Sequence, residues 1–205
     1  MDLPLLFLRY AEIFASKGYT LYMIGGTSRD FLLGKEPADY DFVTDATPKE
    51  ISSFLVAADF AFARFGTVKD VSFGVDVDIA TFRKEGGYTD SRHPSFIEFI
   101  KDPKEDSNRR DFTINALYID KDSNILDFHH GLEDLRNGII RFIGDPQTRI
   151  KEDPLRILRA ERFVDRLHFQ LEEETKKAME EHYELLRLLN PQKVEMERKK
   201  DTNVR

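Results

Sequence analysis

The chain has 205 residues, of which 40% are hydrophobic, so it can bury a sizeable core and is not expected to be disordered. It contains no cysteine, which excludes disulfides, zinc-thiolate sites and cysteine nucleophiles and fits a reducing cytoplasm. Its formal net charge of −7 argues against a surface coated for nucleic acid, but it is compatible with a local basic groove.

The first half of the chain predicts an α/β unit with a mixed sheet. Residues 3–17 are apolar in patches that charged residues interrupt, which predicts an amphipathic helix and neither a signal peptide nor a membrane span. Short helices are expected at 28–34 and at 47–57, where Thr47 and the glutamate three residues later form a capping box. Strands are expected at 19–25, at 40–44, at 67–82 as a hairpin or adjacent strands, and at 95–100.

The second half of the chain is expected to be mainly helical. Residues 109–119 are expected to open a helical stretch, and residues 124–144 indicate a short strand, a helix and another short strand. We therefore expect a first domain at 1–143 and an all-helical region at 144–190. Residues 191–205 are polar and are expected to be either the start of a further helical region or a disordered tail.

Two closely spaced carboxylates point to a cation site. Asp39 and Asp41 are separated by one residue, and side chains at i and i+2 of a strand point to the same face. Such carboxylates repel each other unless a cation lies between them, and magnesium prefers oxygen ligands. Asp76 and Asp78 share a strand face in the same way, and a third carboxylate would support attack at a phosphorus with two metal ions. The alternative is a solvated strand edge that carries acidic residues.

Two glycines precede these carboxylates where a strand meets a helix. Gly25 and Gly26 would let the backbone approach a ligand closely, and the N-terminus of the following helix favours anions. Arg29 would lie one turn into that helix and could reach a phosphate, with Asp30 orienting it or capping the helix. No G-K-[ST] follows, so this is not a Walker A loop, and the alternative is an ordinary strand-helix turn.

Five motifs of the chain occur in the order of a known family. They are "IGGTSRDFLLG…DYDFVTDATP", "DIATFRKEGGYTDSRHPSFIEFI", "NRRDFTINALYID", "DFHHGLEDLRNGIIRFIGDP" and "RIKEDPLRILRAERFVDRLHF". Together they extend from Tyr19 to Phe169 and resemble the class II tRNA nucleotidyltransferase and bacterial poly(A) polymerase family. The resemblance implies a DNA polymerase beta-like nucleotidyltransferase head with a mixed sheet, here 1–143, followed by a helical neck, here 144–190, and then a body and a tail.

The resemblance also implies roles for individual residues. The catalytic carboxylates are expected to be Asp39, Asp41 and Asp78, with Mg2+ held by Asp39 and Asp41. The nucleotide-binding residues of the head are expected to be Gly25, Gly26, Arg29, Arg110 and Asp111, and Asn115 is expected to hold either the ribose or its own loop. Residues 83–94 resemble the family's flexible loop, which is associated with switching from C to A addition, and Arg92 and His93 are expected to assist there.

The motif "EDPLRILRAERF" carries base selection in this family. Asp153 can accept a hydrogen bond from an exocyclic amino group, and Arg156 can donate to a ring acceptor. Cytosine and adenine present an amino donor beside a ring acceptor, whereas uracil and guanine present the opposite pattern, so this pair accepts C and A. Asp153 and Arg156 are expected to be neighbours on one helix face, and Arg159 and Arg162 to meet phosphates or the primer. The alternative is a salt-bridged surface helix.

The resemblance implies addition of CMP and AMP from CTP and ATP to the 3′ end of tRNA in the cytoplasm, without a membrane. The alternatives within the family are a poly(A) polymerase and an enzyme that adds only CC or only A. Two alternatives lie outside the family. A small-molecule nucleotidyltransferase is not expected to carry "RRDFTINA" and "EDPLRILRA". A nucleotide- or RNA-binding fragment would bind its ligand without turnover. Since relatives continue through a body and a tail, we expect either a fragment or a short form that needs a partner or forms homo-oligomers.

Overall fold

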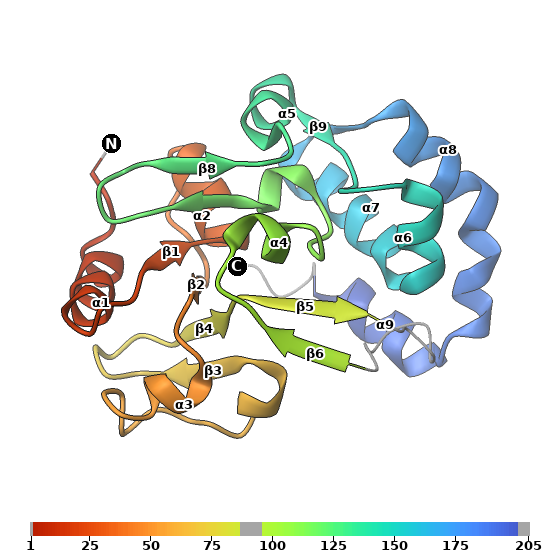
Figure 1. The fold of residues 1–205 in the computed structure, drawn as a ribbon. Helices are drawn as coiled ribbons and strands as arrows, with labels where there is room; N and C mark the ends of the chain where they lie inside the picture. Colours follow the sequence, from red (N-terminus) through yellow and green to blue (C-terminus); the bar gives the residue numbers. More distant parts are fainter. Residues whose placement is uncertain (1, 87–95, 201–205) are drawn as a thin grey trace. The chain divides into compact units, whose positions relative to one another are not determined.

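The computed structural model describes residues 2–86 and 96–200, drawn as a ribbon in Figure 1. These residues form two compact units. The first unit takes the described residues of 1–85, 97–110 and 115–128, and the second takes those of 86–96, 111–114 and 129–205. The predicted carboxylates therefore belong to the first unit, and the predicted base-selecting motif belongs to the second.

A six-stranded sheet forms the framework of the first unit, in the order β3-β4-β2-β1-β7-β8. Strands β2 and β4 run parallel and the other neighbouring pairs run antiparallel, so the sheet is mixed, as the sequence predicted. The strands are β1 (Leu21–Met23), β2 (Tyr40–Thr44), β3 (Thr67–Asp70), β4 (Val77–Thr81), β7 (Leu117–Ile119) and β8 (Ile125–Asp127). A separate two-stranded sheet consists of β5 (Arg83–Gly86) and β6 (Phe96–Phe99).

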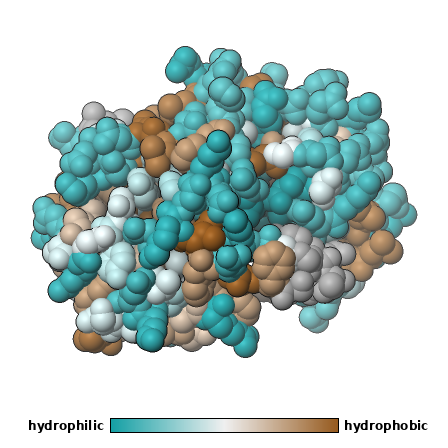
Figure 2. Space-filling view, in the orientation of Figure 1, coloured by the Kyte–Doolittle hydropathy of each residue, from teal (hydrophilic) through white to brown (hydrophobic). Residues whose placement is uncertain are grey.

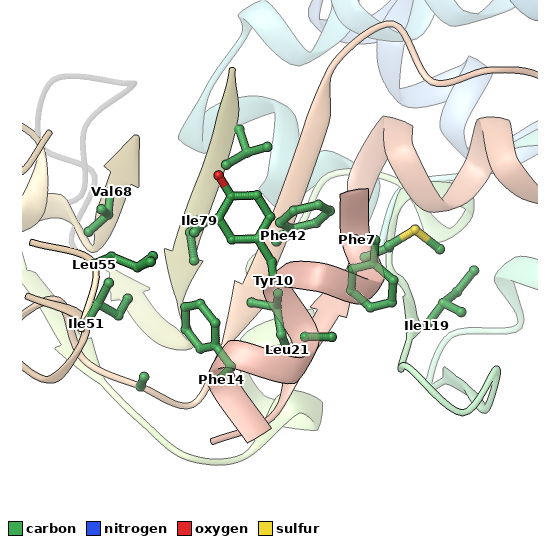
Figure 3. Close-up of a cluster of buried hydrophobic side chains, with 14 residues drawn as sticks. Phe7, Tyr10, Phe14, Leu21, Phe42, Ile51, Leu55, Val68, Ile79 and Ile119 are labelled. Carbon is green, nitrogen blue, oxygen red and sulfur yellow. The ribbon is translucent and has the colours of Figure 1, made fainter. Parts of the chain in front are cut away.

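Helix α1 (Leu5–Ser16) packs its aromatic residues against this sheet. Phe7, Tyr10 and Phe14 are fully buried and project toward strands β2 and β4, as Figure 3 shows. The ring centroids of Phe7 and Tyr10 lie 5.3 and 5.8 Å from that of Phe42 on β2. Burial of each such side chain contributes about 1.5–3 kcal/mol, so this cluster stabilises the strands that carry the predicted carboxylates.

Helix α3 (Pro48–Ile51) is shorter than the sequence predicted. Its capping box is confirmed, since the Thr47 amide donates to Glu50 Oε2 at 2.7 Å and the Thr47 side chain accepts from the Glu50 amide. The expected extension to residue 57 is wrong. The Ser52 and Ser53 hydroxyls each donate to the carbonyl three residues earlier, at 2.7 Å, and such bonds compete with continuation of the helix.

The helical stretch expected at 109–119 is also wrong. The chain forms there the short 3-10 helix η2 (Thr113–Asn115) and then strand β7, whose three residues are all buried. The pattern of a short apolar run that is buried on all sides fits a helix and a strand equally well. Pairing with β1 and β8 makes this run a strand.

The second unit is mainly helical. Its elements are α5 (Gly131–Asn137), β9 (Ile139–Ile140), α6 (Pro146–Glu152), α7 (Leu155–Leu167), β10 (Gln170–Leu171), α8 (Glu173–His182), η3 (Tyr183–Leu188) and α9 (Pro191–Lys199). Strand β10 pairs in parallel with β9, so the expectation of an all-helical region at 144–190 is wrong at this point. The reason is that His168, with a φ of 57°, ends α7 and turns the chain into an extended conformation.

The head, neck and tail boundaries at 143 and 190 stay a prediction. Residues 191–199 form helix α9, which fits the start of a further helical region, whereas residues 201–205 lie outside the described residues. Most of the predicted flexible loop, with Arg92 and His93, also lies outside them.

The surface drawn in Figure 2 is mainly hydrophilic, with hydrophobic residues in small separate groups. Within residues 2–86 and 96–200, no helix has both the length and the apolar composition that crossing a membrane requires.

The short helices α2 (Gly25–Leu32) and α4 (Pro103–Ser107) complete the first unit together with the 3-10 helix η1 (Ala63–Phe65).

Candidate active site

Strand register brings three charged residues into one row across the sheet of the first unit. Asp41 of β2 lies directly opposite Asp78 of β4, and Asp78 lies directly opposite Lys69 of β3. Residues that face each other in register point to the same side of a sheet. Lys69, Asp78 and Asp41, which we call the charged row, therefore share one face, while their neighbours Val68 and Ile79 are buried on the other.

Asp39 lies one residue before β2 and is exposed. Thr27 of helix α2 holds the backbone around it, because its hydroxyl donates to the Asp39 carbonyl at 3.0 Å and accepts from the Asp41 amide at 2.7 Å. The Ile24 amide adds a bond to the Asp41 carbonyl at 3.1 Å. The two predicted metal-binding aspartates are therefore fixed to the glycine turn through their backbone.

The carboxylates act on one another electrostatically. Burial, followed by the nearby charges of Asp78 and Asp39, raises the pKa of the Asp41 carboxyl to about 6, against the opposing effect of Arg110 and Lys69. Like charges held this close favour binding of a cation. Within the described ranges, no group of three or more His, Cys, Asp or Glu side chains is arranged to hold a metal ion. The donors fit magnesium chemically, since that ion commonly takes one or two carboxylates and completes its shell with substrate phosphates and water.

The backbone conformation at Gly25 favours a glycine at this position. Gly25 has a φ of 66°, and a Cβ on it would lie 3.4 Å from Asp41 Oδ2. Helix α2 begins at Gly25 itself, so both glycines lie in the first turn of the helix, where backbone N–H groups have no partner within the helix. The first turn of α2 therefore lies beside the Asp41 carboxylate, and its amides favour an anion.

Arg29 is only 1% exposed, although the sequence predicted that it contacts a phosphate. Its guanidinium pairs with Asp30 at 2.6 Å and donates to Asn115 Oδ1 at 2.9 Å. In this structure Arg29 therefore joins α2 to the end of η2, and both expected roles of Asn115 stay predictions. A direct contact of Arg29 with a phosphate stays a prediction.

Arg110 is held by a buried carboxylate that the sequence reasoning missed. Asp106 is fully buried and accepts bonds from Arg110 at 3.0 Å, Arg109 at 2.9 Å and the Tyr118 hydroxyl at 2.7 Å. Burial alone would raise the pKa of Asp106, but the two arginines, the amide of Arg83 and Tyr118 lower it to about 2. Asp106 lies on α4 and four residues before Arg110, which follows the end of this helix, and this spacing is the signal that could have identified it.

The second unit contains the arginine cluster, which we define as Asp111, Asp153, Arg156 and Arg159. Asp111 accepts from Arg156 at 3.1 Å and also from Arg159, and Arg159 pairs with Asp153 at 2.9 Å. Burial alone would raise the pKa of Asp111, but the two arginines lower it to about 2. The sequence analysis grouped Asp111 with Arg110. Its contacts in the structure are instead with two arginines of the base-selecting motif.

The predicted placement of Asp153 and Arg156 on one helix is wrong. Asp153 ends α6 in an extended conformation, with φ −148° and ψ 95°, and α7 begins at Leu155. The reason is Pro154, because a residue before proline avoids the helical region. Burial raises the pKa of the Asp153 carboxyl, against the opposing charges of Arg159 and Arg156. The Asp153 side chain therefore comes from the bend between α6 and α7, whereas Arg156 lies in the first turn of α7.

Acidic partners of the motif's arginines were also missed. Glu152 accepts from Arg156 at 2.9 Å, and Glu197 of α9 pairs with Arg162 at 2.5 Å. Glu197 is 5% exposed although its helix is mostly polar. Its 35-residue separation from Arg162 gave no local signal. Arg162 therefore anchors α9 in this structure, and its contact with phosphates or primer stays a prediction.

Comparison with known proteins shows what the chain is similar to. Residues 21–141 match the family model of the poly A polymerase head domain. The chain is 42% identical to a CCA-adding enzyme of Lactobacillus helveticus over 180 residues, which cover 88% of this chain and 45% of the relative. It is 40% identical to a CCA-adding enzyme of Staphylococcus haemolyticus over 183 residues, which cover 89% and 46%.

Solved structures agree with this match. The Bacillus stearothermophilus CCA-adding enzyme in complex with CTP superposes with a TM-score of 0.86 and 33% identity, over 96% of this chain and 48% of that one. A tRNA nucleotidyltransferase complexed with a primer tRNA and an incoming ATP analog gives 0.74 and 31%, over 91% and 54%. These matches confirm the family and the fold that the sequence predicted, and the chain spans about half the length of the curated relatives it matches.

Proposed function

Because the chain belongs to the family of the poly A polymerase head domain, we propose that it carries the catalytic and base-selecting residues of a CCA-adding tRNA nucleotidyltransferase. The observation that carries this proposal is the alignment of Asp41 with Asp78 beside the first turn of α2. That arrangement combines carboxylates for a metal ion with amides for a triphosphate, as transfer of a nucleotide requires.

The proposed reaction transfers a nucleoside monophosphate from CTP or ATP to the 3′-hydroxyl of tRNA and releases pyrophosphate. Asp39 and Asp41 would hold Mg2+, and Asp78 is the third carboxylate beside them. When bound, magnesium would polarise the phosphates and make the attacking hydroxyl more acidic. The raised pKa of Asp41, about 6, means that most of its carboxyl groups are ionised near neutral pH and can serve as ligands.

The positive groups of the first unit would position the triphosphate. The amides of Gly25 and Gly26 favour a negative charge, and Arg110 is fixed by Asp106, so its orientation is set before the nucleotide arrives. Such preorganised groups neutralise the charge that develops in the transition state. Arg29 stabilises the same helix through its contacts with Asp30 and Asn115.

In the second unit, Asp153 and Arg156 would select the base by accepting from the amino group of C or A and donating to the adjacent ring nitrogen. Asp111 supports this role because it holds Arg156 and Arg159 together. Arg159 and Arg162 would approach phosphates or the primer. The proposed partners are CTP, ATP and the 3′ end of tRNA, in the cytoplasm.

The test measures incorporation of each labelled NTP, with magnesium, into a tRNA lacking its 3′ CCA and into an unrelated oligo(A) primer. We expect C, C and then A on the tRNA, stopping after three additions. Addition of A alone to both primers would replace the proposal with a poly(A) polymerase, and addition of only C or only A to the tRNA with a partial enzyme. Binding of CTP and ATP without incorporation would identify a nucleotide-binding unit without turnover.

A further inference from the structure

Lys69 has no part in the function proposed above, yet it occupies one end of the charged row. It lies on β3 directly opposite Asp78, which in turn lies opposite Asp41. Its buried neighbour Val68 faces the core, so the Lys69 side chain is directed to the same face as the two carboxylates. The register of three strands thus places an ammonium beside two of the proposed catalytic carboxylates.

The contacts of Lys69 are those of a cation held by acids. Its Nζ lies 2.6 Å from Asp78 Oδ1, with the two side chains 49% and 43% exposed. The carboxylates of Asp78, Asp76 and Asp41 are the negative charges that act on the Lys69 ammonium. These acids come from β2, from β4 and from the segment just before β4.

We propose that Lys69 is a resident cation of the charged row, which competes with a divalent metal ion for Asp78 and so lowers the metal affinity of the nucleotide-free protein. This inference rests on the proposed function in one respect, namely that the aspartates form the metal site. The ammonium 2.6 Å from Asp78 Oδ1 occupies one acceptor position of this carboxylate and places a positive charge beside the others, so a metal ion that binds Asp78 must displace the ammonium or bind against its repulsion.

The length of the lysine side chain makes that movement easy. Its four-carbon stem is flexible and half exposed, so the ammonium can leave Asp78 without a change in the backbone. A nucleoside triphosphate supplies further oxygen ligands and would shift the competition toward the metal. Lys69 therefore makes loading of the carboxylates depend more strongly on the nucleotide.

The test is a titration with Mn2+, read as free Mn2+ by electron paramagnetic resonance without nucleotide. We expect Lys69→Met to tighten Mn2+ binding about twofold to fivefold, the range expected when an exposed ion pair is removed. Lys69→Arg keeps the charge and should remain close to wild type. Lys84→Met is the matched control, because Lys84 pairs with Glu105 at 2.9 Å at similar exposure, 44% and 43%, away from the charged row. Thermal unfolding of each variant verifies the fold.

Unchanged or weaker Mn2+ binding in Lys69→Met would overturn the inference, as would equal tightening in Lys84→Met. Asp41→Asn separates this failure from failure of the proposed function. If Asp41→Asn weakens Mn2+ binding while Lys69→Met changes nothing, only the role of Lys69 is wrong. If Asp41→Asn leaves Mn2+ binding unchanged, or neither wild type nor Lys69→Met binds Mn2+, the proposed metal site and the inference both fail.

Discussion

The charged row of the first unit and the arginine cluster of the second unit arrange acidic residues in opposite ways. In the charged row, two carboxylates lie side by side, and burial together with the repulsion between them raises the pKa of Asp41 to about 6. In the arginine cluster, Asp111 receives bonds from two arginines, and its pKa falls to about 2. Because the Asp41 and Asp111 carboxyls are both partly buried, the sign of the neighbouring charges decides whether the pKa rises or falls.

This contrast separates two kinds of site. Carboxylates without enough positive charge around them are suited to bind a cation that arrives with the substrate. Carboxylates that are already paired are suited to fix the direction of arginines, which then present their remaining donors in a defined geometry. Variants that remove an acid should therefore have different consequences in the two units.

The largest expected effect is on catalysis. Asp41→Ala should lower nucleotide incorporation by at least about a hundredfold, because a charge-stabilising group at the reacting centre is lost. Its stability should not fall, since the substitution removes repulsion with Asp78 and Asp39. Incorporation rate and thermal unfolding measure the two effects, and Asp122→Ala, with a side chain 65% exposed, serves as control. Turnover by Asp41→Ala at the wild-type rate would contradict the assignment of Asp41 as a ligand of the metal ion.

In the arginine cluster, removal of an acid should lower both stability and base discrimination. Asp111→Asn leaves Arg156 and Arg159 without their charged partner and should cost about 1–3 kcal/mol in unfolding free energy. Preference for C and A over U and G should also fall, because Arg156 loses its fixed direction. Urea unfolding and incorporation of the four NTPs measure these effects, with Glu184→Gln, 70% exposed, as control. Retained stability and discrimination would contradict the positioning role.

The pH dependence of stability should also distinguish the two units. The folded pKa of Asp41, about 6, lies above its ordinary value of 3.8, so the folded state binds the proton more tightly than the unfolded state. The stability contributed by protonated Asp41 is complete below about pH 4 and is lost as the pH rises through about 6. Relative to Asp41→Asn, wild type should therefore lose several degrees of unfolding temperature from pH 4 to 7. A constant difference would refute the raised pKa.

Asp111 should show the opposite dependence, because its folded pKa is lowered to about 2. Its contribution is present above about pH 4 and is lost as the pH falls toward 2. Comparison of wild type with Asp111→Asn over that lower range provides the internal control for the Asp41 measurement.

The smallest effect is expected where the charges of the second unit are exposed. Arg187 pairs with Glu184 at 2.7 Å, with side chains 80% and 70% exposed. Arg187→Ala should change the free energy of unfolding by less than about 0.5 kcal/mol, since water screens such pairs. Urea unfolding measures it, and a loss comparable to that of Asp111→Asn would show that exposure does not explain the contrast.

Local sequence determined much of this molecule. The strand at 40–44 and the capping box at Thr47 depend on neighbours within a few residues, and the structure contains both. A helix was also expected at 28–34, and the structure has it at Gly25–Leu32, so that it includes the two glycines. The i, i+2 spacing likewise put Asp39 and Asp41 in one motif, and the order of five motifs identified the family that the comparisons confirm.

Tertiary structure decided the rest, because the deciding interactions join residues far apart in the chain. Strand pairing turned 117–119 into β7 although an apolar run of that length fits a helix equally well. Register alone placed Lys69 beside Asp78 and Asp78 beside Asp41, and packing joined Asp111 to Arg159 across 48 residues. Composition and spacing identify which groups carry the chemistry, but the surroundings that set their charge and direction exist only after the chain has folded.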